Sequence, residues 1–114
     1  MDYPMAAAHH STAVVWLDRS RALVARERAG RPAVAQVDRQ LDSEATYLLR
    51  VIHEAAHADR VVIMGPDASR LAFEREYVAL YQRPDHLIDL GIEAAPQPYQ
   101  LVDRLRFMDV AVPR

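Results

Sequence analysis

The sequence contains one stretch with the spacing of a zinc-hydrolase motif, His53-Glu54-Ala55-Ala56-His57. On a helix, two histidines four residues apart share one face, where they can bind zinc while the glutamate acts as general base. The apolar stripe of this segment passes beside His53 and leaves His57 and Glu54 nearer to solvent. A third ligand would have to come from a helix beyond the following strand. We therefore favour a helix face that carries two histidines and holds no metal.

The basic residues offer a second kind of chemistry, because all 14 of them are arginine. The planar guanidinium group binds phosphate through paired hydrogen bonds, although a codon bias toward arginine and alanine explains this composition better. Residues 1–40 hold six arginines and four acidic residues, whereas the rest of the chain is acidic. The candidate phosphate-binding residues stand on the first hairpin that the sequence predicts: Arg19, Arg21, Arg26 and Arg28.

Composition excludes several other classes of protein. With 114 residues, 51% of them hydrophobic, and a net charge of −2, the chain is expected to form one compact domain. It has no cysteine, which excludes disulfides and thiolate chemistry, and its three glycines are isolated, which excludes Gly-rich phosphate loops. No apolar run approaches the ~18 residues that a membrane span needs. We expect a flexible lead-in at residues 1–11, a single domain at 12–114 and a cytoplasmic location.

The hydrophobic periodicity predicts the elements that must position these residues. Residues 12–18, 21–29 and 33–39 read as three short strands joined by tight turns. A helix capped by Asp42 or Ser43 then runs to about Ala58, and residues 61–64 form a buried strand. A second helix, capped by Asp67 or Ser69, runs through residue 83. Residues 87–95 contain a fifth, short strand, placed at residues 91–94, and a last helix spans residues 99–108.

This order, β-β-β-α-β-α-β-α, predicts an α/β fold. Three antiparallel strands followed by right-handed crossovers build a five-strand mixed sheet with helices on both faces. The order matches the ribonuclease-H-like architecture. Nucleases of that architecture clamp two metal ions between carboxylates, and this chain has an acidic residue near each of the required places. These are Asp18, Glu44 or Glu54, Asp67 and Asp103, all of which helix capping or solvent exposure also explains.

The turn after the fourth strand carries a family resemblance. Residues 61–77, VVIMGPDASRLAFEREY, resemble a Gly-Pro motif of small bacterial translational-machinery proteins. Residues 13–27 resemble the strand-turn-strand start of the same family. These proteins are similar to the central, ribonuclease-H-like domain of Pelota and of the archaeo-eukaryotic class-one release factor. The family-motif residues are Gly65, Pro66 and Arg70, where Arg70 replaces a lysine and Asp67 replaces a small residue.

The resemblance implies a role in translation without the chemistry of peptide release. In release factors, an insertion between the third strand and the first helix carries Gly-Gly-Gln. In this chain that interval, residues 39–42, has no glycine and no room for a long loop. We therefore expect a non-catalytic protein that needs no cofactor and binds the ribosome or tRNA. The alternatives are a metal-dependent hydrolase, of the zinc or the two-metal kind, and a homodimeric interaction module.

Overall fold

The computed structural model describes residues 11–91 and 93–111. The lead-in predicted for residues 1–11 lies, apart from Ser11, outside this described part. The elements follow the chain in the order that the periodicity predicts. They are β1 (Thr12–Leu17), β2 (Arg21–Arg28), β3 (Arg31–Asp38), α2 (Glu44–Glu54), β4 (Arg60–Met64), α3 (Ser69–Tyr81), the 3-10 turn η1 (Pro84–His86), β5 (Leu87–Gly91) and α4 (Pro98–Ala111).

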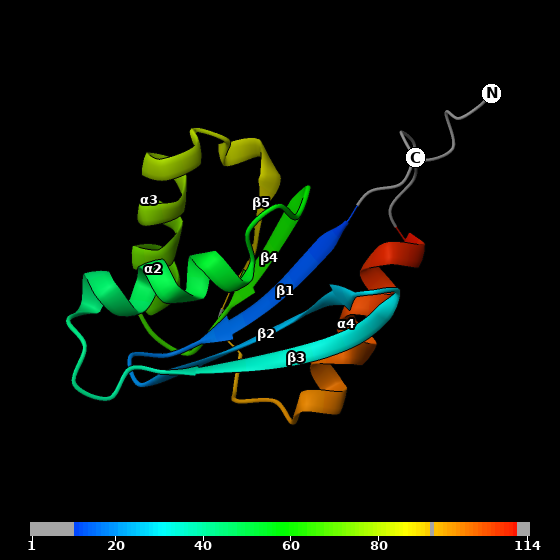
Figure 1. Ribbon diagram of the computed structural model, residues 1–114, viewed down its shortest axis with the longest axis horizontal. Helices are drawn as coiled ribbons and strands as arrows, with labels where there is room; N and C mark the ends of the chain where they lie inside the picture. The colour runs from blue at the N-terminus through cyan, green and yellow to red at the C-terminus, as the bar shows by residue number, and fades with distance from the viewer. Residues whose placement is uncertain (1–10, 92, 112–114) are drawn as a thin grey trace.

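The strands form one sheet in the order β3-β2-β1-β4-β5. The first three strands are antiparallel neighbours, whereas β4 pairs in parallel with both β1 and β5. Ala29 and Gly30 both have positive φ, the backbone conformation that two-residue hairpin turns require, and they join β2 to β3. The predicted fold class, a five-strand mixed sheet with helices on both faces, is confirmed (Figure 1).

The sheet separates two hydrophobic layers. Alternate residues of a strand point to opposite faces, so Ala13, Val15 and Leu17 of β1 pack toward α2 and α3. Val14 and Trp16 pack toward α4 on the other face. Because both faces are covered, every residue of β1 is buried. This explains why the central strands read as continuous apolar runs in the sequence.

The first helix, α2, begins as predicted and ends earlier than predicted. Ser43 is its N-cap, since the side-chain oxygen accepts a hydrogen bond from Thr46 N. The helix ends at Glu54 instead of about Ala58. His57 has φ +70°, a left-handed conformation that no α-helix continues through. The residues after Glu54 therefore form the turn that leads into β4.

The later elements also differ from the predicted bounds. The fifth strand is Leu87–Gly91, earlier than the predicted residues 91–94, and Gly91 ends it with φ +87°. The second helix has Ala68 at its N-cap with no side-chain cap, and it ends at Tyr81 where Gln82 turns left-handed. Within the described ranges, no helix combines the length and apolar character needed to cross a membrane.

Candidate nucleic-acid interface at the strand ends

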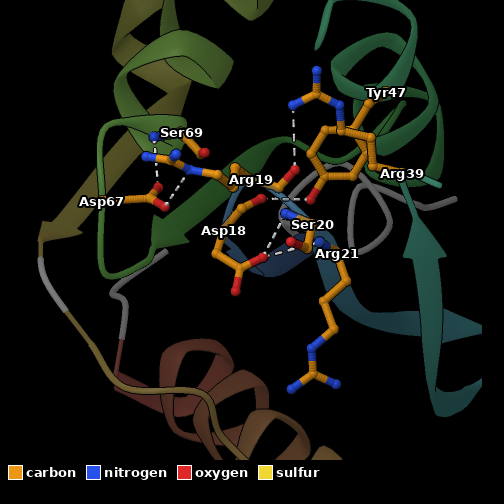
Figure 2. Close-up of polar contacts among 8 residues, drawn as sticks. All are labelled: Asp18, Arg19, Ser20, Arg21, Arg39, Tyr47, Asp67 and Ser69. Atoms are coloured by element: carbon orange, nitrogen blue, oxygen red, sulfur yellow. Dashed lines mark hydrogen bonds and ion pairs between the residues drawn. The ribbon is translucent and has the colours of Figure 1, made fainter. Parts of the chain in front are cut away.

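The carboxyl ends of β1 and β4 meet at one edge of the sheet. From there β1 continues into β2 on one side, whereas β4 continues into α3 on the other. In open α/β sheets, ligands bind outside the strand ends where the connections diverge in this way, in a crevice. We therefore call this edge of the sheet the crevice edge. The loops of this edge are residues 18–20, 39–43 and 65–68. Figure 2 shows the polar side chains that they bring together.

Gly65 sets how closely the strands approach at this edge. A Cβ atom built on it would lie 2.1 Å from the backbone oxygen of Leu17, the last residue of β1. Its N–H donates to the carbonyl of Gly91 at 3.1 Å, and its own carbonyl accepts from Glu93 N at 3.4 Å. The Trp16 indole N–H also donates to the Glu93 carbonyl, at 3.0 Å. Gly65 thus joins β1, β4 and the segment after β5 at one point.

Asp18 shapes the turn between β1 and β2. Its Oδ1 accepts hydrogen bonds from the backbone N–H groups of Ser20 at 2.8 Å and Arg21 at 2.9 Å. Its carbonyl accepts a third, from the Tyr47 hydroxyl of α2 at 2.8 Å (Figure 2). Burial, and after it the negative charge of Asp18, raises the pKa of the Tyr47 hydroxyl above its usual range. The hydroxyl therefore stays protonated and keeps donating.

Asp67 shapes the second turn. Its Oδ1 accepts a hydrogen bond from Ser69 N at 2.8 Å, and its Oδ2 lies 3.8 Å from Arg19 Nε. Burial raises the pKa of this carboxyl, but the hydrogen bonds from Ser69 and the charge of Arg19 outweigh it and lower the pKa overall. A carboxylate at the start of α3 repels an anion and occupies a backbone donor that the anion would use. Asp67 thus makes the backbone N–H groups at the start of α3 unsuited to binding phosphate.

The four predicted arginines lie at two separate ends of β2. Arg19 and Arg21 lie at the crevice edge. Arg26 lies five residues beyond Arg21 along the strand, about 17 Å away at the rise of an extended chain. The Arg19 side chain is 78% exposed. The Arg21 guanidinium lies over the Trp16 ring, 5.6 Å from its centroid. These two arginines are the ones that remain accessible at the edge.

The other two arginines are engaged with α2. Arg26 Nη1 donates to the carbonyls of Glu54 at 2.9 Å and Ala56 at 2.5 Å, just where the helix ends. Burial, and then the charge of Arg28, lowers the pKa of Arg26, while Glu54 opposes that change. Arg28 Nη2 pairs with Glu54 Oε1 at 2.9 Å. The predicted cluster of four arginines is therefore not one surface.

The zinc-motif residues do not form a metal site in this geometry. Because α2 ends at Glu54, His53 and His57 do not share one helical face. The Glu54 carboxylate, which would be the general base, is paired with Arg28. In residues 11–91 and 93–111, no three His, Asp or Glu side chains gather as a metal would need.

The acidic residues considered for a two-metal site are also dispersed. Asp18 and Asp67 share the crevice edge, but each accepts hydrogen bonds from its own turn. Glu44 begins α2 and is exposed, and Glu54 lies at the far end of that helix. Asp103 is exposed on α4, on the opposite face of the sheet from α2. The structure thus assigns these residues to turns and to solvent.

The remaining family-motif residue, Arg70, faces β5. Its Nη1 lies 3.6 Å from Asp89 Oδ2, and its side chain is only 18% exposed. Sequence reasoning missed two further residues that fix this edge, Tyr47 and Arg39. Arg39 donates to the carbonyls of Asp42 at 3.0 Å and Arg19 at 3.4 Å. No sequence pattern marks either role, because both depend on carbonyls that are distant along the chain or in an irregular loop.

This arrangement of strands and helices is similar to part of the Pelota proteins. Archaeoglobus fulgidus Pelota matches with a TM-score of 0.65 at 10% identity, over 93% of this chain and 34% of that one. Thermoplasma acidophilum Pelota matches with a TM-score of 0.60 at 20% identity, over 90% and 34% of the two chains. The chain shares its fold with a Pelota segment.

A third match is Saccharomyces cerevisiae Dom34, described as a translation termination-like factor involved in RNA quality control pathways and interacting with Hbs1. Its TM-score is 0.57 at 7% identity, over 88% of this chain and 36% of that one. The chain therefore spans about a third of the length of these proteins. No protein-family model matches the sequence, and no curated protein matches it significantly.

Proposed function

We propose that the protein is a non-catalytic, translation-associated module that binds RNA of the ribosome or tRNA. The observation that carries this proposal is the fold match to Pelota and Dom34 over 88–93% of the chain. Fold alone does not determine function, so the site residues must supply the chemistry. They offer one exposed and one partly exposed guanidinium group, those of Arg19 and Arg21, and no assembled catalytic group.

The absence of a release loop supports the non-catalytic part of the proposal. The connection from β3 to α2 comprises residues 39–43 and contains no glycine. Asp42 N donates to the Arg39 carbonyl at 2.9 Å, and the Arg39 guanidinium holds the Asp42 carbonyl, so the loop closes on itself. By its resemblance to release factors, the chain would need a Gly-Gly-Gln insertion here to act on peptidyl-tRNA. We therefore propose binding without peptide release.

The phosphate contacts are assigned to Arg19 and Arg21. Arg19 is largely exposed, and its 3.8 Å approach to Asp67 is too long for a hydrogen bond. Arg21 is held over Trp16, which fixes its guanidinium without using its N–H donors. Because the whole chain carries a net charge of −2, such contacts must act locally and not through an overall basic field.

Cosedimentation with ribosomes across a salt series tests this proposal. We expect the wild type to cosediment at about 50 mM salt and to be released steeply toward about 200 mM, because phosphate binding releases counterions. The double variant Arg19→Ala/Arg21→Ala should bind about tenfold more weakly and show a salt slope shallower by up to about two units.

The matched control removes the same charge elsewhere. Arg75 and Arg106 are exposed on α3 and α4, so Arg75→Ala/Arg106→Ala should bind as the wild type does. An equal loss of ribosome affinity in both double variants would show that net charge, and not Arg19 and Arg21 in particular, drives binding. A wild-type protein that stays unbound at about 50 mM salt would refute the proposal.

A further inference from the structure

A polar depression lies at the edge of the sheet where β4 and β5 begin, opposite the crevice edge. It has a volume of about 250 Å³ and sits between the end of α3, η1 and the turn that leads into β4. In Figure 1 these segments lie at the upper end of the sheet, away from the strand ends drawn in Figure 2. The side chains that line it include Tyr77, Tyr81, Arg83, His57, His86 and Asp59.

A row of aromatic rings along α3 leads into this depression. The Phe73 and Tyr77 ring centroids are 6.2 Å apart, and those of Tyr77 and Tyr81 are 5.0 Å apart. Exposure rises along the row, from 0% for Phe73 through 4% for Tyr77 to 41% for Tyr81. Tyr81 packs on the buried Tyr77 ring, and its other part is an aromatic surface that the described part of the chain leaves exposed.

Side chains with nitrogen donors line the same depression as this ring. Arg83 follows α3 and is exposed, and no ion pair joins it to a carboxylate in the described part of the chain. His57 and His86 line the same depression. His57 holds a left-handed φ of +70°, a conformation uncommon in non-glycine residues, although histidine is enriched in it. The turn at His57 brings an imidazole to the mouth of the depression.

The acidic residues nearby are partly occupied. Asp59 Oδ2 accepts a hydrogen bond from Ser11 N at 3.0 Å, which directs that oxygen toward the start of β1. Asp85 lies 3.8 Å from His86 through its Oδ2, and its side chain is 80% exposed. Proteins that bind single-stranded nucleic acids combine an aromatic surface with adjacent cationic groups. The base stacks on the aromatic ring while the phosphate binds the cationic groups.

We propose that this depression binds one unpaired nucleotide of an RNA strand. The base stacks on Tyr81, and the phosphate lies against Arg83 with His57 and His86 as further donors. The inference deepens the proposed RNA-binding function, on which it rests, and it uses residues at the other edge of the sheet. A phosphopeptide would use the cations but would leave the stacking surface of Tyr81 idle, so the aromatic row favours RNA.

Nuclear magnetic resonance titrations with adenosine 5′-monophosphate test the proposal directly. We expect the amides of residues 57–59, 81–83, 85 and 86 to shift with AMP, and to shift much less with inorganic phosphate or adenosine alone. Tyr81→Ala and Arg83→Ala should each weaken AMP binding about tenfold, whereas Tyr81→Phe should keep it, because stacking needs only the ring. Leu80→Ala is the matched control, since Leu80 is the exposed neighbour of Tyr81.

Two outcomes would overturn the proposal. If inorganic phosphate gives the same shifts and affinity as AMP, the depression is an anion site and the base plays no part. If AMP leaves these amides unshifted, or if Tyr81→Ala binds AMP as the wild type does, the stacking assignment is wrong. AMP binding by a protein that fails to cosediment with ribosomes would support this site while refuting the proposed function, so the two failures are distinguishable.

Discussion

At the scale of single residues, Asp18 and Asp67 show that the nearest backbone decides what a carboxylate does. Both residues stand where a metal nuclease would carry ligands. Each accepts a backbone hydrogen bond two residues ahead, from Ser20 and Ser69 respectively. Aspartate favours this contact because its short side chain reaches its own turn. The same property makes aspartate common in turns, so its presence at a strand end is weak support for catalysis.

Tyr47 provides the residue-scale prediction. Its hydroxyl donates to the Asp18 carbonyl at 2.8 Å, and burial is the main cause of its raised pKa. Tyr47→Phe should lower the free energy of unfolding by about 1 kcal/mol at pH 7, the usual value of one internal hydrogen bond. Chemical denaturation of both proteins measures this difference.

The raised pKa also fixes the sign of the pH dependence. A group whose folded pKa lies above its unfolded value of about 10 stabilises the fold fully below that pH, and the stabilisation is lost as the pH rises further. The wild type should therefore lose stability above about pH 10 faster than Tyr47→Phe. Tyr77, whose pKa is also raised by burial, is present in both proteins and cancels in the comparison. A constant difference from pH 7 to 11 would contradict this prediction.

At the scale of elements, Arg26 couples a strand to the end of a helix. A helix leaves its last carbonyls without intrahelical partners. Here the Arg26 guanidinium donates hydrogen bonds to the carbonyl of Glu54, the last residue of α2, and to that of Ala56 just beyond it. This contact coincides with the end of α2 at Glu54. Sequence reasoning instead extended the helix to about Ala58, because apolar spacing continues through Ala56 and reveals nothing of an arginine on another strand.

The element-scale prediction compares two neighbouring arginines. Arg26→Leu should destabilise the protein by about 1–3 kcal/mol, because it leaves carbonyls unpaired in a partly buried place. Arg28→Ala should cost at most about 1 kcal/mol, because its ion pair with Glu54 is partly exposed. Denaturation gives both values. Hydrogen exchange should show faster opening in the last turn of α2 for Arg26→Leu only, and equal effects of the two variants would contradict the coupling.

At the scale of the whole molecule, the sheet brings chemically different groups to its two edges. The crevice edge holds Arg19 and Arg21, and the opposite edge holds the aromatic depression at Tyr81.

The side chains of α3 also bear on the predicted homodimer. In the sequence, the apolar residues on two sides of the second helix favoured a second copy: Leu71 and Val78 on one side, and Phe73, Tyr77 and Leu80 on the other. Phe73 and Tyr77 are buried against this chain's own sheet, whereas Leu71 and Leu80 are exposed. A homodimer stays a prediction, with less surface to support it.

Gly65 provides the whole-molecule prediction, because three strands depend on it. In Gly65→Ala the new Cβ would meet the Leu17 carbonyl oxygen, so β1 and β4 must move apart. We expect a loss of about 2–4 kcal/mol in thermal or chemical unfolding, in the range of severe packing defects. Gly30→Ala is the control: its φ is +79° but nothing lies within 4 Å of the new Cβ, so it should lose only about 1 kcal/mol. Similar losses would contradict the steric argument.

The sequence by itself determined the fold class, because strand and helix periodicities depend on local alternation of apolar residues. It also limited the first helix cap to Asp42 or Ser43, because a cap is a contact within one helical turn, and the structure has Ser43. It located the fifth strand within residues 87–95 but placed it in the later half of that range, since the positive φ of Gly91 that ends β5 is not visible in the apolar pattern around it.

Only the tertiary structure decided which functional residues meet. The spacing of Arg19, Arg21, Arg26 and Arg28 suggested one basic hairpin, but the length of β2 and the capture of Arg26 by α2 divide it. Tyr81, Arg83 and His57 come together from separate segments around β4. Such meetings depend on how crossovers stack helices on a sheet, and that information is spread over the whole chain instead of residing in any one motif.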